Sequence, residues 1–293
     1  MVDVGFTLQP DDEFLELTHS IAAAADYLEI APETTWYETP SGALLPNGFH
    51  RRFAALRARG VPFVAHGVGL SPGSDDAADG ARLERWLARI RDDHATFGFG
   101  WYTDHLGASS LAGLAMTLPL ATPLDDASAG RTRARLARLQ SIVPDVGLEN
   151  TVFYFSLGDP LDEPRFIERV LDAPGMHLLL DLHNVYTSAM NFGFDAREWL
   201  ARAPLDRVIE IHVSGGSESD PAWLPSGRTL RLDGHDAAVP EAVWSLLEEI
   251  APRCAQLRGI TLERMEGTVT DAREACALRD ELDRVRGVAR RLG

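Results

Sequence analysis

Histidine and acidic residues recur where short apolar segments of this chain end, and both side-chain types are common ligands of metal ions. They occur at Leu28-Glu29, His66-Gly67, Asp104-His105, Glu149-Asn150, Asp181 to Asn184, Glu210 to His212 and Glu263-Arg264, and Asp233 and His235 add two more between the last two of these segments. Imidazole nitrogens and carboxylate oxygens without cysteine form a ligand set suited to iron, manganese or zinc. If the fold brings these segments together, they supply the donors of a metal centre.

The apolar segments themselves have the length of buried β-strands, and segments with helical spacing separate them. Eight strands are expected, at Val4–Leu8, Tyr27–Ile30, Phe63–His66, Trp101–Asp104, Gly147–Glu149, Leu178–Asp181, Val208–His212 and Ile260–Glu263. Strands too apolar to be half-exposed, alternating with helices, predict a parallel sheet covered by helices, which is the α/β class. Eight such repeats predict a single (β/α)8 TIM barrel over residues 1–293. A doubly wound open sheet is the alternative.

Closure into a barrel matters for the polar residues, because the carboxyl ends of all the parallel strands meet at one mouth. Unpaired carboxylates and imidazoles buried together there are costly, and a bound cation removes that cost. Taken singly, His66 is explained as a turn residue, Glu149 as a helix cap and Asp233 as part of a turn dipeptide. A chain without a metal centre would require all of these separate explanations to hold at once. Four other histidines are expected to be structural or surface residues, namely His19, His50, His94 and His177.

Composition excludes several functional classes. The formal charge of −16 opposes a nucleic-acid partner, and no apolar run approaches the roughly 20 residues of a membrane helix. All 28 Lys+Arg residues are arginine, so chemistry that needs a lysine Schiff base or a P-loop lysine is excluded. Cys254 and Cys276 have no CxxC partner, and the start of the chain shows no signal-peptide pattern. We therefore expect reduced thiols and a cytoplasmic location.

Seven motifs occur in an order that resembles a known enzyme family. They are His66-Gly67-Val68-Gly69-Leu70-Ser71, Asp104-His105-Leu106, Leu148-Glu149-Asn150, Leu178-Leu179-Leu180-Asp181 with Asn184-Val185-Tyr186, Glu210-Ile211-His212, Asp233-Gly234-His235 and Leu262-Glu263-Arg264. Together they resemble the multinuclear non-haem iron-dependent oxidative enzymes, over nearly the whole chain from Val4 to about Arg286. No single motif is specific, but seven in register are.

The resemblance implies a TIM barrel that holds two or three iron ions and uses O2 as co-substrate. The metal ligands that it implies are His66, His105, Glu149, Asp181, His212, Asp233, His235 and Glu263. Members of the family oxidise residues, often cysteine, in ribosomally made peptides. They usually act with a small partner protein that recognises the leader of the peptide. By the same resemblance, Asp104, Asn150 and Asn184 orient the ligands at the catalytic centre.

Two positions depart from the pattern of that family. His183 stands where the family often has asparagine, and we expect it to add a metal ligand or an acid/base group at the catalytic centre. Gly216 stands where the family often has histidine or a bulky residue, which is expected to alter the substrate pocket. The longest irregular segment, Ser214–Leu230, is expected to be a lid or a partner-binding loop over the mouth. Loop material such as this segment is also expected to be the only surface free for docking.

Other functions stay open from the residues alone. A divalent-metal isomerase or phosphodiesterase barrel carries similar His, Asp and Glu residues at its strand ends. Such isomerases commonly also use a lysine, which this chain lacks, and an endonuclease needs a basic surface that a charge of −16 opposes. A non-catalytic scaffold that stores metal is the third hypothesis.

Overall fold

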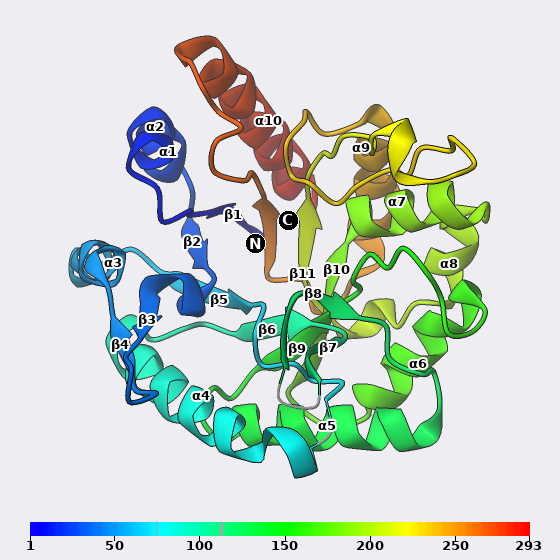
Figure 1. Cartoon of the computed structure of the whole chain (residues 1–293). Helices are drawn as coiled ribbons and strands as arrows, with labels where there is room; N and C mark the ends of the chain where they lie inside the picture. Colours follow the sequence, from blue (N-terminus) through cyan, green and yellow to red (C-terminus); the bar gives the residue numbers. More distant parts are fainter. Residues whose placement is uncertain (75, 112–113) are drawn as a thin grey trace.

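Eight parallel strands form a closed barrel at the centre of the molecule (Figure 1). The computed structural model describes residues 1–74, 76–111 and 114–293. Around the barrel, the strands follow the order β1 (Asp3–Thr7), β12 (Gly259–Leu262), β11 (Val208–Val213), β10 (Met176–Asp181), β9 (Val146–Glu149), β6 (Tyr102–His105), β5 (Phe63–Gly67) and β2 (Tyr27–Ile30). β2 then pairs with β1 and closes the barrel. The predicted TIM barrel is confirmed, and the open-sheet alternative is excluded.

Helices surround the barrel and bury one apolar face against it (Figure 1). In the last helix, Leu278, Leu282 and Val285 repeat at helical spacing and are buried. Asp271 caps this helix, because its side chain accepts a hydrogen bond from the backbone N–H of Glu274. The α-helices are α1 (Asp12–Leu17), α2 (His19–Ala22), α3 (Gly48–Ala58), α4 (Asp76–Phe97), α5 (Asp126–Gln140), α6 (Glu163–Val170), α7 (Leu182–Phe192), α8 (Ala196–Arg202), α9 (Glu241–Ile250) and α10 (Ala272–Arg291).

The barrel interior has an apolar layer formed by a small cluster of its own. The cluster consists of Tyr27, Val64, Trp101 and Ile209. Two glycines make room for Tyr27, since a methyl group at Gly5 would lie 2.4 Å from its ring and one at Gly259 would lie 2.2 Å from its hydroxyl oxygen. This filled interior gives the polar residues at the mouth a rigid floor.

The loops at the mouth contain structure that sequence patterns did not predict. Two antiparallel hairpins follow barrel strands β2 and β6: β3 (Trp36–Glu38) with β4 (Leu44–Pro46), and β7 (Ala108–Leu111) with β8 (Leu114–Leu120). These hairpins are further loop structure beside Ser214–Leu230, so the surface open to docking is not confined to that segment. At its end, that loop packs on α7, where the side chain of Asn191 bonds both backbone groups of Arg231.

Short 3-10 helices complete the connections. They are η1 (Pro32–Thr35), η2 (Pro160–Asp162), η3 (Leu205–Arg207), η4 (Pro221–Trp223) and η5 (Ala251–Arg253). In the part of the chain that the structure describes, no helix combines the length and the apolar character needed to span a membrane.

Candidate metal centre

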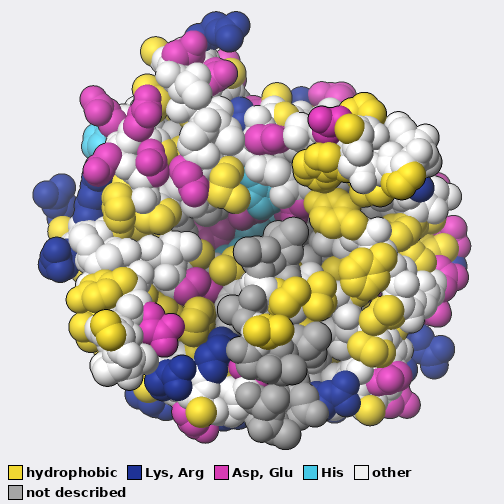
Figure 2. Space-filling model, in the orientation of Figure 1, with side chains coloured by type: hydrophobic (Ala, Val, Ile, Leu, Met, Phe, Trp, Pro, Cys, Tyr) yellow, Lys and Arg dark blue, Asp and Glu magenta, His cyan; other side chains and the backbone are white. Residues whose placement is uncertain are grey.

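The ends of six barrel strands bring imidazole and carboxylate groups together in the mouth. They are His66 of β5, His105 of β6, Glu149 of β9, Asp181 of β10, His212 of β11 and Glu263 directly after β12. Asp233 and His235 join them from the loop that connects β11 to α9. Figure 2 shows histidine and acidic side chains at the bottom of a central hollow.

Glu149 faces two histidines with one of its oxygens. Its Oε2 atom lies 3.5 Å from Nε2 of His66 and 3.2 Å from Nε2 of His105. The other ring nitrogens are occupied, because Nδ1 of His66 lies 3.0 Å from the Thr103 hydroxyl and Nδ1 of His105 lies 3.0 Å from the Gly67 carbonyl oxygen. A carbonyl only accepts, so neutral His105 carries its hydrogen on Nδ1 and presents a free Nε2 lone pair. We call His66, His105 and Glu149 group A.

The second oxygen of Glu149 faces a different set of residues, which we call group B. It consists of Glu149, Asp181, His212 and Glu263, whose donor atoms all lie within 4.8 Å of one another. Nδ1 of His212 lies 3.0 Å from Oε2 of Glu263 and 4.0 Å from Oε1 of Glu149. Two ligands of one ion, each about 2.1 Å from it, lie about 3 Å apart when they subtend a right angle. The spacing in groups A and B therefore suits ligands that share a cation.

A third set, group C, consists of His183, Asp233, His235 and Glu263. Nε2 of His235 lies 2.8 Å from Oδ1 of Asp233 and 3.6 Å from Oε2 of Glu263. Nδ1 of His183 lies 3.5 Å from the same oxygen of Asp233. His235 has a φ of 48°, a left-handed conformation that is uncommon for a residue with a side chain. Such strain persists where the surroundings hold it, often at a functional site.

Seven nitrogen and oxygen atoms of these groups are buried without a hydrogen-bond partner in the described residues. No well-aligned hydrogen bond within the described residues reaches Glu149 Oε2, Asp181 Oδ2, His183 Nδ1, His212 Nδ1, Asp233 Oδ1, His235 Nε2 or Glu263 Oε2. Buried polar atoms without partners are rare in native proteins, and here seven of them gather around one space. Metal cations bound between the groups would satisfy all of them, so the residues fit a metal cluster.

The protonation behaviour of these side chains reflects the same crowding. Burial raises the pKa of Glu149 well above its ordinary value and lowers the pKa of His66 and His105. Burial also works against a charged His212, but the nearby Glu263 carboxylate helps to hold the pKa of His212 well above its ordinary value. Without metal, protons thus occupy positions between acidic groups. Cations that displace those protons would leave neutral imidazoles and ionised carboxylates, which are the forms that bind metal.

A second layer of carboxylates lies beneath His212. Nε2 of His212 lies 3.1 Å from Oε2 of Glu29, and Glu29 accepts a hydrogen bond from the Thr7 hydroxyl at 3.0 Å. Glu210 accepts hydrogen bonds from Trp101 Nε1 at 2.6 Å and from the Tyr27 hydroxyl at 2.8 Å. The sequence marks both glutamates as strand residues, but it did not predict their role beneath the centre. The signal was available for Glu210, because a residue two positions before His212 lies on the same face of a strand.

Two asparagines hold the acidic ligands in place. Asn184 donates from Nδ2 to Oε1 of Glu149 at 3.3 Å and to the Asn150 carbonyl oxygen at 3.1 Å. The side chain of Asn150 exchanges two hydrogen bonds of 2.9 Å with the backbone of Asp181. These contacts tie Glu149 to Asp181, so both asparagines are placed to orient ligands, as the resemblance implies.

The two departures from the family pattern lie against each other. His183 is buried in α7, and its Nε2 lies 3.3 Å from the Thr187 hydroxyl while its Nδ1 faces Asp233. A methyl group at Gly216 would lie 2.9 Å from Cε1 of His183 and 2.0 Å from the Leu232 carbonyl oxygen. The small residue at 216 thus leaves the space that the larger residue at 183 occupies. In this arrangement, His183 faces group C as a candidate ligand.

The remaining candidates lie outside the three groups. Asp104 accepts a hydrogen bond from the backbone N–H of Leu70 at 3.1 Å, so it anchors the loop after β5. His50 pairs with Asp93 at 2.9 Å, and His177 pairs with Asp145 at 3.2 Å. The prediction placed His177 before its strand, whereas it lies within β10. His19 and His94 lie in outer helices, and Cys254 and Cys276 are free thiols.

A cavity of about 710 Å³ opens above the metal-facing residues. His105, Asp233 and His235 are part of its lining, together with residues of both hairpins. Its lining also includes the charged side chains of Glu33, Glu38, Arg82 and Arg85, and the aromatic and thioether side chains of Trp86, Met116, Phe153, Tyr154, Phe155 and Met265. This volume lies in the range of typical ligand sites, about 300–1,000 Å³, and exceeds what a single side chain fills.

The closed barrel and the three ligand groups define a TIM-barrel protein with a candidate polynuclear metal centre. The sequence profile of a family described as "RiPP precursor modification enzyme MbnB/TglH/ChrH" matches residues 4–290. The chain belongs to this family, and the resemblance drawn from the seven motifs is confirmed.

Two similar proteins carry the name UPF0276. The UPF0276 protein of Bordetella pertussis is 37% identical over 228 residues, which cover 76% of each chain. The UPF0276 protein of Pseudomonas aeruginosa strain UCBPP-PA14 is 33% identical over 270 residues, or 92% of this chain and 86% of the relative. Both are similar along most of the barrel.

Solved structures with the same fold are more distant in sequence. D-psicose 3-epimerase from Clostridium cellulolyticum H10 has a TM-score of 0.61 at 13% identity, covering 98% of this chain and 99% of that one. A xylose isomerase domain protein from Planctomyces limnophilus has a TM-score of 0.61 at 17% identity, covering 99% of this chain and 98% of that one. At these identities, the likeness concerns the fold alone.

Proposed function

We propose that this protein is an oxidase that holds two or three iron ions, uses O2, and modifies a ribosomally synthesised peptide at cysteine. Membership of a family of peptide-modifying enzymes supports the peptide substrate. One observation supports a cluster of ions over a single ion: the two oxygens of Glu149 face different ligand groups. Oε2 lies 3.2 Å from Nε2 of His105, and Oε1 lies 4.0 Å from Nδ1 of His212. A carboxylate shared between two cations lowers the repulsion between them, which a one-metal site does not require.

Under this proposal, each group holds one ion. Glu149 is shared between groups A and B, and Glu263 is shared between groups B and C through the contacts of its Oε2 with His212 and His235. The proposed ligands are the eight residues that the resemblance implies, with His183 added on the side of group C. Asp233 and His235 of group C come from a loop and not from a strand end, so the ion of this group is expected to be the most labile.

Iron bound in these groups would supply a redox-active centre that takes electrons from a substrate thiolate and passes them to O2. Residues of the chain orient the ligands and shape the cavity. Asn184 keeps Glu149 oriented between groups A and B through its 3.3 Å hydrogen bond. Asp104 fixes the loop after β5 and so shapes the cavity wall next to His105. Below the centre, the barrel interior is filled by Glu29 and Glu210 and by the apolar cluster that includes Tyr27 and Trp101.

The substrate and partner are proposed from the cavity and the family. A cavity of about 710 Å³ lined by aromatic residues suits a short peptide segment. The acidic charge of −16 opposes nucleic acid as a substrate. A small partner protein that binds the leader would raise the local peptide concentration at the mouth. We further propose that the chain acts as one domain in the cytoplasm.

Co-expression tests the proposal. The chain is produced together with the products of its neighbouring genes, and any short cysteine-bearing peptide among them is then analysed by mass spectrometry. A mass loss or an oxygen gain at cysteine that requires the chain, a partner protein, iron and air is the expected result. Turnover of a free sugar or other small metabolite by the purified barrel alone would contradict it, and would favour the isomerase class of its structural neighbours.

A further inference from the structure

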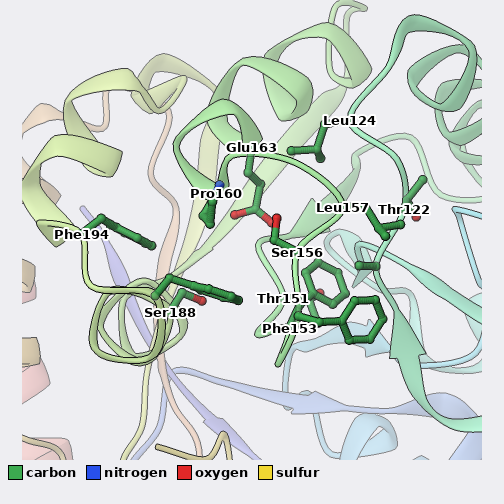
Figure 3. A pocket seen from close by; sticks show the side chains of 13 residues that line it. Thr122, Leu124, Thr151, Phe153, Ser156, Leu157, Pro160, Glu163, Ser188 and Phe194 are labelled. Atoms are coloured by element: carbon green, nitrogen blue, oxygen red, sulfur yellow. The ribbon is translucent and has the colours of Figure 1, made fainter. Parts of the chain in front are cut away.

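A second, smaller pocket lies beside the main cavity, on the other side of the segment that follows β9. Figure 3 shows it from close by, with Phe153 and Phe194 at different sides and the carboxyl group of Glu163 facing Ser156. Thr151, Phe153 and Phe155 line both this pocket and the main cavity. The two spaces are thus neighbours that share one wall.

The pocket lining combines apolar and aromatic side chains with the hydroxyl groups of Thr122, Thr151, Ser156 and Ser188 and with one acid, Glu163. Apart from Glu163, its larger side chains are Leu124, Phe153, Phe155, Leu157, Phe192 and Phe194. At the rim, Phe155 is 50% exposed and Leu157 is 53% exposed, which is high for side chains of this kind. Four phenyl rings offer faces that attract cations, with a carboxyl group among them.

Glu163 has no charged partner within the described ranges of the chain. Its Oε2 atom accepts a hydrogen bond from Trp199 Nε1 at 3.1 Å, and no arginine forms an ion pair with it. Burial raises the pKa of Glu163 to about 8. A nearby cation stabilises the ionised form of such an acid more than it stabilises the ionised form of an exposed acid. The reason is that the cation offsets the cost of burying the negative charge.

The size of the pocket favours a slender cation. The pocket offers about 30 Å³, and one water molecule needs about 10–15 Å³. An ammonium with its last methylene is about as large as two water molecules, whereas a guanidinium group has four heavy atoms in a plane. The smaller ammonium is therefore the better match.

We propose that this pocket binds the side chain of a lysine in the peptide substrate, with its ammonium on Glu163 and its methylenes against the phenyl rings. The inference rests on the proposed peptide substrate and adds a specificity determinant to it. An extended peptide that crosses the shared wall places one side chain in the main cavity and a neighbouring one in the lysine pocket.

The test measures binding without turnover. Three peptides, Ac-Gly-Cys-Gly-Xaa-Gly-NH2 with lysine, arginine or norleucine at Xaa, are titrated into the purified chain, and Kd is obtained by peptide-detected NMR. We expect the lysine peptide to bind at least tenfold more tightly than the norleucine peptide, with arginine in between. Glu163→Gln should remove this preference and leave the norleucine Kd unchanged. Glu168→Gln, an equal charge change at an exposed position of α6, should keep the preference.

Equal Kd values for lysine and norleucine in the unaltered chain would overturn the inference, as would a preference that Glu163→Gln retains or that Glu168→Gln also removes. If Glu163→Gln does not fold, Phe155→Ala at the rim is expected to weaken the lysine preference, and an unchanged preference there would count against the pocket. These outcomes are separate from those of the oxidase proposal. An active oxidase without lysine preference refutes the pocket alone, and lysine binding by an inactive protein refutes the oxidase alone.

Discussion

Nε2 of His212 lies 3.1 Å from Oε2 of Glu29, while Nδ1 on the other side of the same ring lies 3.0 Å from Glu263 in the mouth. Glu29 therefore fixes which nitrogen of His212 carries hydrogen, and with it the orientation of the ring. We expect Glu29→Gln to lower metal affinity about 10- to 100-fold, as changes to such supporting carboxylates do. Competition with a chelator measures this. Glu38→Gln, on an exposed hairpin, is the control, and an equal effect there would remove the role of Glu29.

Glu149 is the residue that we propose as a ligand shared between groups A and B. Glu149→Gln should lose more than one equivalent of metal, because its two oxygens face groups A and B. Circular dichroism should show that the barrel survives, since neither hydrogen bond of Asn150 to Asp181 involves this side chain. Full metal content and activity in the variant would mean that Glu149 is only a structural residue.

The ion proposed for group C should be removable without loss of the ions in groups A and B. Replacing Asp233 and His235 together by alanine should lower the metal content by about one equivalent and leave groups A and B occupied, because those groups have their own ligands. His183→Asn, which removes the imidazole that faces Asp233, should weaken the binding of the same ion to a smaller extent. Elemental analysis of each variant decides. An unchanged metal count in the double variant would place Asp233 and His235 in an ordinary turn.

Glu163 predicts a dependence of stability on pH. Its pKa is about 8 in the folded chain, whereas an unperturbed glutamate has a pKa of about 4.3. Its contribution to stability is therefore fully present below about pH 4 and is lost as the pH rises towards 8. Glu163→Gln cannot ionise, so the variant should gain stability relative to the unaltered chain as the pH rises from 5 to 8. Urea unfolding at a series of pH values measures this, and a constant difference would show that Glu163 is not buried as described.

The barrel was predictable because each of its strands is a short apolar segment followed by a polar residue, and all eight lie within two residues of their predicted bounds. The hairpin β3–β4 was not, because Trp36 and Leu44 lie in a short stretch without strand alternation. Its pairing depends on packing at the mouth, where the Trp36 ring lies edge-on to Trp86 of α4. Such a contact between distant segments cannot be predicted from the local sequence.

The candidate ligands were found because strand ends converge in any parallel barrel, whatever the sequence of the loops. The supporting role of Glu29 and the exchange of size between His183 and Gly216 depend on distances between segments far apart in the chain. Glu163 gave no signal either, because an acid at the first position of a helix is ordinary. Only the fold shows that aromatic side chains from other segments surround it.

Iron stoichiometry tests the central claim most directly. The chain is expressed with ample iron, purified without air, and analysed for metal content per polypeptide, with Glu168→Gln as the matched control for Glu149→Gln. The account predicts two or three iron ions per chain in the unaltered protein and in the control, and a loss of more than one in Glu149→Gln. A single zinc ion with no iron, unchanged by Glu149→Gln, would contradict it.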